Sequence, residues 1–307
     1  MKYLKSIKQF KAFGRLYNWI NPFRGTILML HRVVTELSLM NDNRLLEITP
    51  EFLEKIILQY KSAGCEFVSL DSMLKMQKFH SEKSYVCFTF DDGYRDNLSL
   101  ALPVFEKYQV PFAVYITTDF INQQSFLWWY ILEDIIRQNE AVFLQNGESY
   151  FCRTIQEKNE TFNVIKQVLK KNPIVSEQAF YHCLDARYQS DNYKQPEMLN
   201  WEDVRILQRS GLCTIASHGV SHSSLTIVSD EVLNFELRES KKIIEEKTGT
   251  VITHFAYPYG DMNKKVATAV KNSGYFSAVK IDGGMQRKFQ DSYFLKRSWL
   301  YESIKSS

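Results

Sequence analysis

The sequence predicts an α/β fold with a parallel sheet, because short apolar runs alternate along the chain with amphipathic helical patterns. The runs are rich in β-branched and aromatic residues and are bounded by turn residues, as is typical of buried strands. They cover residues 26–30, 85–90, 111–117, 212–216 and 251–256. This alternation of strand and helix allows both an open parallel sheet and a closed barrel.

Three helical patterns between these runs carry start and stop signals. The first has Pro50 in its first turn and ends at Gly64. The second begins at Asn200, has acidic residues in its first turn and ends before Gly211. The third covers residues 229–247 and begins with a serine that can serve as N-cap. Such helices connect successive strands of a parallel sheet.

Residues 120–199 depart from this alternation. Helical patterns follow one another there, and their apolar content is too high for a linker. We therefore expect one main domain, residues 25–307, with a helical insertion at about 120–199.

The first 24 residues form a separate amphipathic segment. Its apolar residues recur at helical spacing, and Lys2, Lys5 and Lys8 interrupt the apolar stretch that a signal peptide requires. We therefore expect a cytoplasmic protein. A basic amphipathic helix either docks on its own domain or lies on an anionic membrane surface, and the second case would make the protein membrane-associated.

The composition argues against several classes of protein. The net charge is only +3 over 307 residues, which gives no support for nucleic-acid binding. The five cysteines are odd in number and form no CxxC pair, which argues against a disulfide framework and a structural zinc site. No window of about 20 apolar residues occurs, so no membrane-spanning helix is expected. The sequence leaves the oligomeric state open.

Four apolar runs end close to residues that can do chemistry. His31, Asp91, His218 and Tyr257 each follow a run directly or after one residue. In parallel α/β folds the carboxyl ends of the strands meet at one face, and the active site lies there. We therefore expect these residues to converge on one site.

Two motifs supply candidate metal ligands and a base. His218 and His222 have a spacing at which two imidazoles can face one metal ion. Asp91 and Asp92 are adjacent and cannot point the same way, so one can bind the metal while the other accepts a proton. Gly93 allows the chain to turn sharply after them. A site with two histidines and one carboxylate suits hydrolytic zinc and also non-haem iron.

Three segments together resemble the polysaccharide deacetylase family, the NodB homology domain of carbohydrate esterase family 4. They are residues 89–93 (TFDDG), 217–222 (SHGVSH) and 255–260 (FAYPYG). The resemblance covers most of residues 26–120 and 200–300. It implies a distorted, incomplete (β/α) barrel of the NodB type.

The resemblance also implies roles within the site. Asp91 would be the general base, and Asp92, His218 and His222 would hold a divalent metal, usually Zn²⁺, with Ni²⁺ or Co²⁺ as alternatives. The backbone N–H of Tyr259 would help to stabilise the oxyanion. The substrate would be an N-acetylated glycan, and the reaction would remove N-acetyl groups from hexosamine units of a polysaccharide or its precursor.

Two positions depart from the family pattern. Ala256 stands where the third motif usually has an arginine that orients the base. Residues 295–297 (LKR) stand where a late Leu-x-His motif usually supplies the acid. Residues 28–33 (LMLHRV) resemble the early strand of the poly-N-acetylglucosamine deacetylase branch, in which the motifs are circularly permuted and the acid comes first. We therefore assign His31 as the general acid.

Four further residues receive weaker assignments. Arg297 and Tyr257 are expected to orient Asp91 or to bind substrate. Trp128 and Trp129 either line a sugar groove or belong to the core of the insertion, and we expect the core. Two alternative functions remain open at this point: an O-deacetylase or other amide hydrolase that uses the same site, and an inactive carbohydrate-binding module.

Overall fold

The computed structural model describes residues 24–77, 83–124, 126–169, 177–189, 193–286 and 290–302. The predicted amphipathic segment, residues 1–24, lies outside this part of the chain except for its last residue. Every helix within the described residues is too short or too polar to span a membrane.

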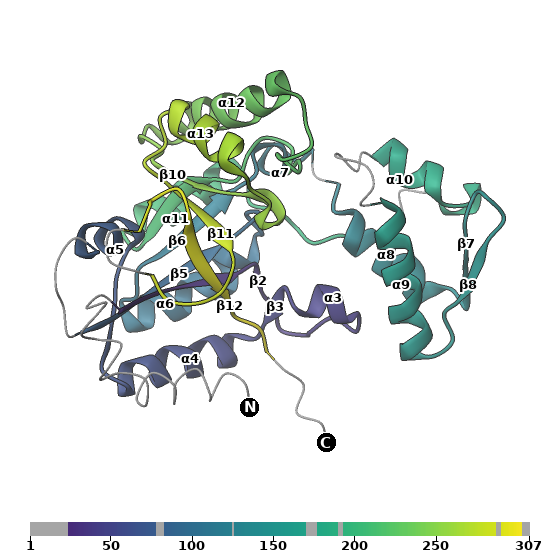
Figure 1. The fold of residues 1–307 in the computed structure, drawn as a ribbon. Coiled ribbons are helices and arrows are strands. Elements are labelled where there is room, and N and C mark those ends of the chain that lie inside the picture. Colours follow the sequence, from purple (N-terminus) through teal and green to yellow (C-terminus); the bar gives the residue numbers. More distant parts are fainter. Residues whose placement is uncertain are drawn as a thin grey trace.

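Seven parallel strands close into a barrel, which confirms the predicted (β/α) barrel (Figure 1). In order around the barrel they are β1 (Arg24–Leu30), β12 (Leu295–Trp299), β11 (Ser277–Ile281), β10 (His254–Ala256), β9 (Cys213–Ser217), β6 (Phe112–Ile116) and β5 (Ser84–Phe90). The barrel closes because β5 pairs with β1 from one end to the other. A further strand, β4 (Cys65–Phe67), pairs with β5 outside the ring.

Helices cover the outside of the barrel. They are α4 (Pro50–Ser62), α5 (Leu70–Met76), α6 (Leu102–Tyr108), α11 (Trp201–Arg209), α12 (Asp230–Thr248) and α13 (Lys264–Asn272), together with the short π-helical turn η1 (Asn97–Ala101). The three predicted helices are confirmed. Helix α4 begins at Pro50, Asn200 caps α11 in a capping box with Asp203, and Ser229 caps α12.

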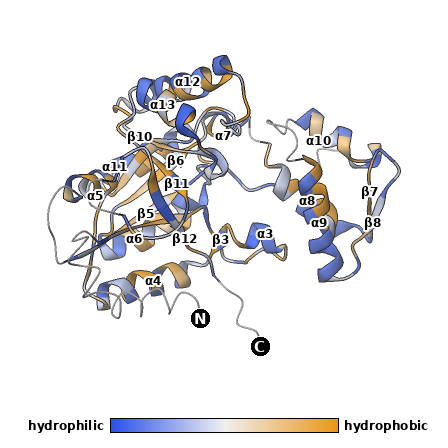
Figure 2. Cartoon of the chain, viewed as in Figure 1, coloured by the Kyte–Doolittle hydropathy of each residue, from blue (hydrophilic) through white to orange (hydrophobic). Residues whose placement is uncertain are grey.

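The barrel strands send alternate side chains into two apolar layers. One layer packs between the strands and the covering helices. The other fills the barrel interior and contains several small side chains, among them Ala113, Ala216 and Ala256. Figure 2 shows the central strands as largely hydrophobic and the outer helices as rich in hydrophilic residues. The carboxyl ends of the strands are thereby held in fixed positions by packing on both sides.

The chain between β6 and α11 forms a helical unit that stands beside the barrel in Figure 1. It contains α8 (Trp128–Gln138), α9 (Ile155–Leu169), α10 (Glu177–Cys183), the turn η2 (Ala186–Tyr188) and the antiparallel strands β7 (Ala141–Phe143) and β8 (Ser149–Phe151). The short helix α7 (Thr118–Ile121) precedes this unit and lies on the barrel against α12. Its apolar side chains form a cluster of their own, centred on α8 and α9. The β7–β8 pair was not predicted, because three-residue strands are too short to show a periodic pattern.

The segment between β1 and α4 joins the barrel to this helical unit. It contains β2 (Arg32–Val33), α3 (Asn41–Arg44) and β3 (Glu47–Ile48). Met40 is fully buried within the apolar cluster of the insertion. Asn43 Nδ2 donates to Glu133 Oε2 of α8 at 2.6 Å, and Ser38 Oγ donates to the same carboxylate. The joint between the two parts is therefore both apolar and hydrogen-bonded.

Candidate active site

A cavity of about 400 Å³ lies where the carboxyl ends of the barrel strands meet the insertion. The barrel contributes His31, Asp91, Asp92, His218, His222, Tyr259, Ile281 and Trp299 to its lining. The insertion contributes Trp128, Trp129, Phe162 and Lys166, and the segment before α4 contributes Asp42, Asn43, Leu45 and Leu46. The predicted convergence of strand-end residues thus places the candidate acid, base and metal ligands around one cavity.

Asp92, His218 and His222 lie close enough together to hold one cation. Each offers a ligand atom, and these atoms lie within 4.8 Å of one another. Asp92 Oδ1 lies 3.6 Å from His218 Nε2 and 3.4 Å from His222 Nε2. Asp92 has a φ of 74° and His222 a φ of 59°. Residues other than glycine rarely adopt this left-handed backbone conformation, and it is concentrated at functional sites.

A hydrogen bond fixes the orientation of the His218 ring. Its Nδ1 lies 2.8 Å from the carbonyl oxygen of Ala256. Because a carbonyl oxygen only accepts, Nδ1 carries the proton and Nε2 presents its lone pair toward Asp92. Asp92 Oδ1 is buried and has no hydrogen-bond partner within the described chain. A divalent cation would satisfy this oxygen and both imidazoles, so the residues present fit a metal site.

Burial and neighbouring charge set the protonation of these three residues. Burial, together with the charge of Asp91, raises the pKa of Asp92 to about 8. Burial also lowers the pKa of His218 and lowers that of His222 well below its usual range. Both imidazoles are therefore neutral and able to act as ligands, and a cation would favour the ionised form of Asp92.

Asp91 is held by a buried two-point ion pair with Arg297. The Nη1–Oδ1 and Nη2–Oδ2 distances are both 2.6 Å. Arg297 also donates to Thr89 Oγ1 at 3.2 Å and lies over the ring of Tyr115. Burial alone would raise the pKa of Asp91, but Arg297 and His218 hold it well below its ordinary value. Asp91 is therefore ionised and fixed in orientation.

Arg297 extends from β12 into the interior layer of the barrel, because it lies over the ring of Tyr115, which belongs to that layer. Ala256 belongs to the same layer. An arginine therefore contacts Asp91 although the third motif lacks one.

His31 follows β1 and is mostly buried, with 9% of its surface exposed. Its ring centroid lies 6.1 Å from that of Trp299, and its carbonyl oxygen accepts from Asn97 Nδ2 at 2.9 Å. Burial lowers the pKa of His31 to about 4, and the charge of Asp91 opposes this effect. The resting imidazole is therefore neutral and must take up a proton before it can act as an acid.

The two tyrosines of the third motif lie in different surroundings. Tyr259 lines the cavity, and its ring centroid lies 4.5 Å from that of His222. Tyr257 is fully buried in the outer apolar layer, and its hydroxyl donates to the carbonyl oxygen of Tyr293 at 2.9 Å. This position argues against the predicted substrate contact of Tyr257 and gives it a part in holding the motif in place.

Trp128 and Trp129 were predicted to be core, with a sugar groove as the alternative, and Glu236 was not predicted to belong to the site. Trp128 and Trp129 pack in the insertion as expected, but they also line the cavity, and the ring centroid of Trp129 lies 6.0 Å from that of His222. Glu236 contacts the loop between the two histidines. Its sequence signal is a carboxylate on the same helix face as Leu233 and Leu237, where core residues are expected.

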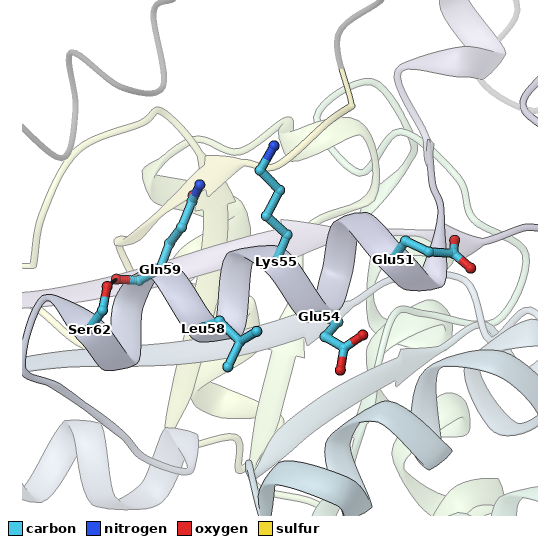
Figure 3. A pocket seen from close by; sticks show the side chains of 6 residues that line it. All are labelled: Glu51, Glu54, Lys55, Leu58, Gln59 and Ser62. Atoms are coloured by element: carbon cyan, nitrogen blue, oxygen red, sulfur yellow. Dashed lines mark hydrogen bonds between the residues drawn. The ribbon is translucent and has the colours of Figure 1, made fainter.

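A second hollow of similar size runs along the outer side of α4 (Figure 3). All its lining side chains come from this one helix: Glu51, Glu54, Lys55, Leu58, Gln59 and Ser62. Glu54 is already engaged with Lys107 and Tyr108. The hollow contains no histidine and lies away from the strand ends, so it is not the candidate active site.

The comparisons with known proteins agree with this geometry. The family model described as polysaccharide deacetylase matches residues 79–278, more than half of the chain. The chain belongs to the polysaccharide deacetylase family. The chain is 23% identical to YxkH of Bacillus subtilis (strain 168), whose name also describes it as a polysaccharide deacetylase. The match extends over 282 residues, which are 91% of this chain and 73% of that protein. Membership implies a hydrolase that acts on acetyl groups.

Solved structures share the fold at low sequence identity. The Streptococcus pyogenes deacetylase PplD, solved with acetate, has a TM-score of 0.62 at 16% identity, covering 91% of this chain and 93% of its own. IcaB from Ammonifex degensii has a TM-score of 0.60 at 15% identity, with the same two coverages. A de-N-acetylase from Aggregatibacter actinomycetemcomitans has a TM-score of 0.59 at 16% identity, covering 92% of this chain and 97% of its own.

Proposed function

We propose that this protein is a metal-dependent deacetylase that hydrolyses N-acetyl groups on hexosamine units of a polysaccharide or its glycan precursor. The contrast between two adjacent carboxylates carries this proposal. Asp91 has both oxygens paired with Arg297 and is ionised, whereas Asp92 presents an unpaired oxygen to two imidazole nitrogens. One carboxylate is thus arranged as a base and the other as a metal ligand, which is the pairing that metal-assisted hydrolysis needs.

The donor set favours zinc as the metal, with nickel or cobalt as alternatives. Two imidazoles and one carboxylate leave coordination positions open for water and substrate. When bound, the metal would polarise the acetyl carbonyl and activate water for attack.

The residues around the metal site have complementary parts in the reaction. Asp91 accepts a proton from the attacking water, and Arg297 keeps its oxygens in place. The backbone N–H of Tyr259 donates to the developing oxyanion, a part that the family resemblance supports. His31 delivers a proton to the leaving amine after taking one up, which the nearby charge of Asp91 favours. The amine and acetate then leave.

The insertion supplies the surface that receives the sugar. Trp128, Trp129 and Phe162 present aromatic side chains to the same cavity as the metal ligands. Aromatic faces pack well against the apolar faces of sugar rings. The likeness to a solved structure described as a de-N-acetylase supports an N-acetyl rather than an O-acetyl substrate for this protein.

Acetate release from a panel of N-acetylated and O-acetylated glycans tests this function. We expect acetate from N-acetylated hexosamine polymers, loss of the activity with a chelator, and recovery on addition of Zn²⁺. Asp92→Asn and His222→Ala are expected to bind metal poorly and to be inactive, because each removes a ligand. Asp185→Asn is the matched control, since Asp185 forms an exposed pair with Arg187 outside the cavity.

Three outcomes would overturn parts of the proposal. Full activity of Asp92→Asn or of chelator-treated protein would remove the metal from the mechanism. Acetate release from O-acetylated glycans alone would make the protein an O-deacetylase. Glycan binding without any acetate release, in protein with bound metal, would make it a carbohydrate-binding module.

A further inference from the structure

A carboxylate behind the cavity holds the loop that carries both histidines. Glu236 lies in α12 and is almost completely buried, with 2% of its surface exposed. Its Oε2 accepts from the backbone N–H of Val220 at 2.7 Å and of Ser221 at 3.1 Å. Its Oε1 accepts from the hydroxyl of Ser221 at 2.5 Å and of Ser223 at 3.4 Å. One side chain thus binds four donors of the segment between His218 and His222 and just beyond it.

The backbone of this loop needs such support. Gly219 has a φ of 89° and His222 a φ of 59°. A Cβ added to Gly219 would lie 2.9 Å from Glu236 Oε2, so the carboxylate packs directly against the loop backbone. The carbonyl groups of Gly219 and Val220 accept from the backbone of α7. Glu236 therefore accepts from the N–H groups of the loop, and α7 donates to its carbonyl groups.

We propose that Glu236 is a positioning residue that fixes the separation of the His218 and His222 nitrogens and thereby sets the affinity of the site for its metal. This inference rests on the metal site of the proposed function. It assigns Glu236 no contact with substrate. Outer residues that hold metal ligands in place are typically worth about 10–100-fold in metal affinity.

The division of donors between the two oxygens predicts which substitutions are tolerated. Oε2 faces two backbone N–H groups, which can only donate, whereas Oε1 faces two hydroxyls, which can also accept. A glutamine can therefore place its carbonyl oxygen on the N–H groups and its amide on the hydroxyls. Alanine removes both acceptor oxygens, and with them all four hydrogen bonds, and leaves the backbone N–H groups of Val220 and Ser221 without this partner. Glu236→Gln should keep the loop in place, and Glu236→Ala should not.

Zn²⁺ titration of metal-free protein, by calorimetry or by competition with a chromophoric chelator, tests this proposal. The Kd for Zn²⁺ is expected to rise about 10–100-fold in Glu236→Ala and to stay within a few-fold of wild type in Glu236→Gln. Glu239→Ala is the matched control, since Glu239 lies three residues further along α12 and pairs with Lys242 near the surface. Circular dichroism checks that each variant is folded.

The outcomes separate this proposal from the proposed function. An unchanged Kd in folded Glu236→Ala would overturn the role of Glu236 alone. Wild-type protein that binds no Zn²⁺, Ni²⁺ or Co²⁺ would overturn both proposals. If Glu236→Ala does not fold, Ser221→Ala takes its place, because it removes one donor to Oε1 and is expected to weaken Zn²⁺ binding by a few-fold. An unchanged Kd in Ser221→Ala, together with a weakened one in Glu236→Gln, would contradict the donor arrangement.

Discussion

The two sides of the cavity are built differently. On the barrel side the lining groups are charged or titratable, and bonds within the barrel hold several of them in place, such as the Arg297 pair to Asp91 and the Ala256 carbonyl at His218. On the insertion side the lining is mainly aromatic, and it comes from helices with their own apolar cluster. This contrast fits the proposed function, in which the barrel side holds the reacting groups in a fixed geometry and the insertion side receives the glycan.

This difference extends to how the two sides are attached. The barrel groups follow strands that are paired on both edges, so their positions are set by the sheet itself. The insertion is joined to the barrel through side chains between β1 and α4, including Met40 and Asn43. Substitutions on the barrel side should thus act on kcat and metal binding, and substitutions on the insertion side on KM.

Outside the proposed metal ligands, the largest effect is expected on the barrel side, from Arg297→Lys. A lysine keeps the charge but cannot hold both oxygens of Asp91 at once, so the base loses its fixed orientation. We expect kcat to fall roughly 10²-fold with little change in KM or in bound metal. Steady-state kinetics and metal analysis measure this. Arg209→Lys is the control, because Arg209 forms an exposed pair with Glu202. Unchanged kcat in folded Arg297→Lys would show that the ion pair serves only stability.

A smaller effect of a different kind is expected from Trp129→Ala on the insertion side. Removing the indole takes an aromatic face out of the cavity while the metal ligands stay in place. We expect KM for a glycan polymer to rise about tenfold and kcat to change little. Trp201→Ala is the control, since Trp201 lies outside the cavity and donates to Asn122. A fall in kcat with unchanged KM would contradict the division of labour between the two sides.

The sequence was sufficient for features that are local. Apolar runs marked five of the barrel strands, β1, β5, β6, β9 and β10, but not β11 and β12. Asp91, Asp92, His218 and His222 stand in short motifs directly after two of the predicted runs. The closure of the barrel depends on the pairing of β1 with β5 and β12, which no local pattern encodes. The direction in which each motif side chain points also could not be predicted from the neighbouring sequence. Tyr257 is buried, whereas Tyr259, two residues later, lines the cavity.

Contacts between distant segments explain what was missed or left open. Arg297 lies 206 positions from Asp91, so the sequence allowed it either an orienting or a substrate-binding role, and only the folded barrel shows its contact with Asp91. Glu236 carried a signal, a carboxylate on a core-facing position of a helix, but its partners lie in a loop that precedes the helix. A charged residue at a buried position of an amphipathic helix indicates that a hydrogen-bonding or charged partner lies in another segment of the chain.

The smallest effect on catalysis is expected from Glu47→Gln, at the joint between the two sides. Glu47 is buried between Arg32, Ser38 and Tyr130, and burial raises its pKa from 4.5 to about 7. Between these pH values the folded protein binds more protons at this group than the unfolded chain does, so the free energy of unfolding falls as pH rises. The loss in the free energy of unfolding from this group is at most of the order of 3 kcal/mol.

Denaturant unfolding between pH 5 and 7.5 should show a shallower pH dependence in Glu47→Gln than in wild type. Glu66→Gln, at an exposed pair with Lys83, should match wild type. An identical slope in Glu47→Gln would mean that the joint does not respond to pH.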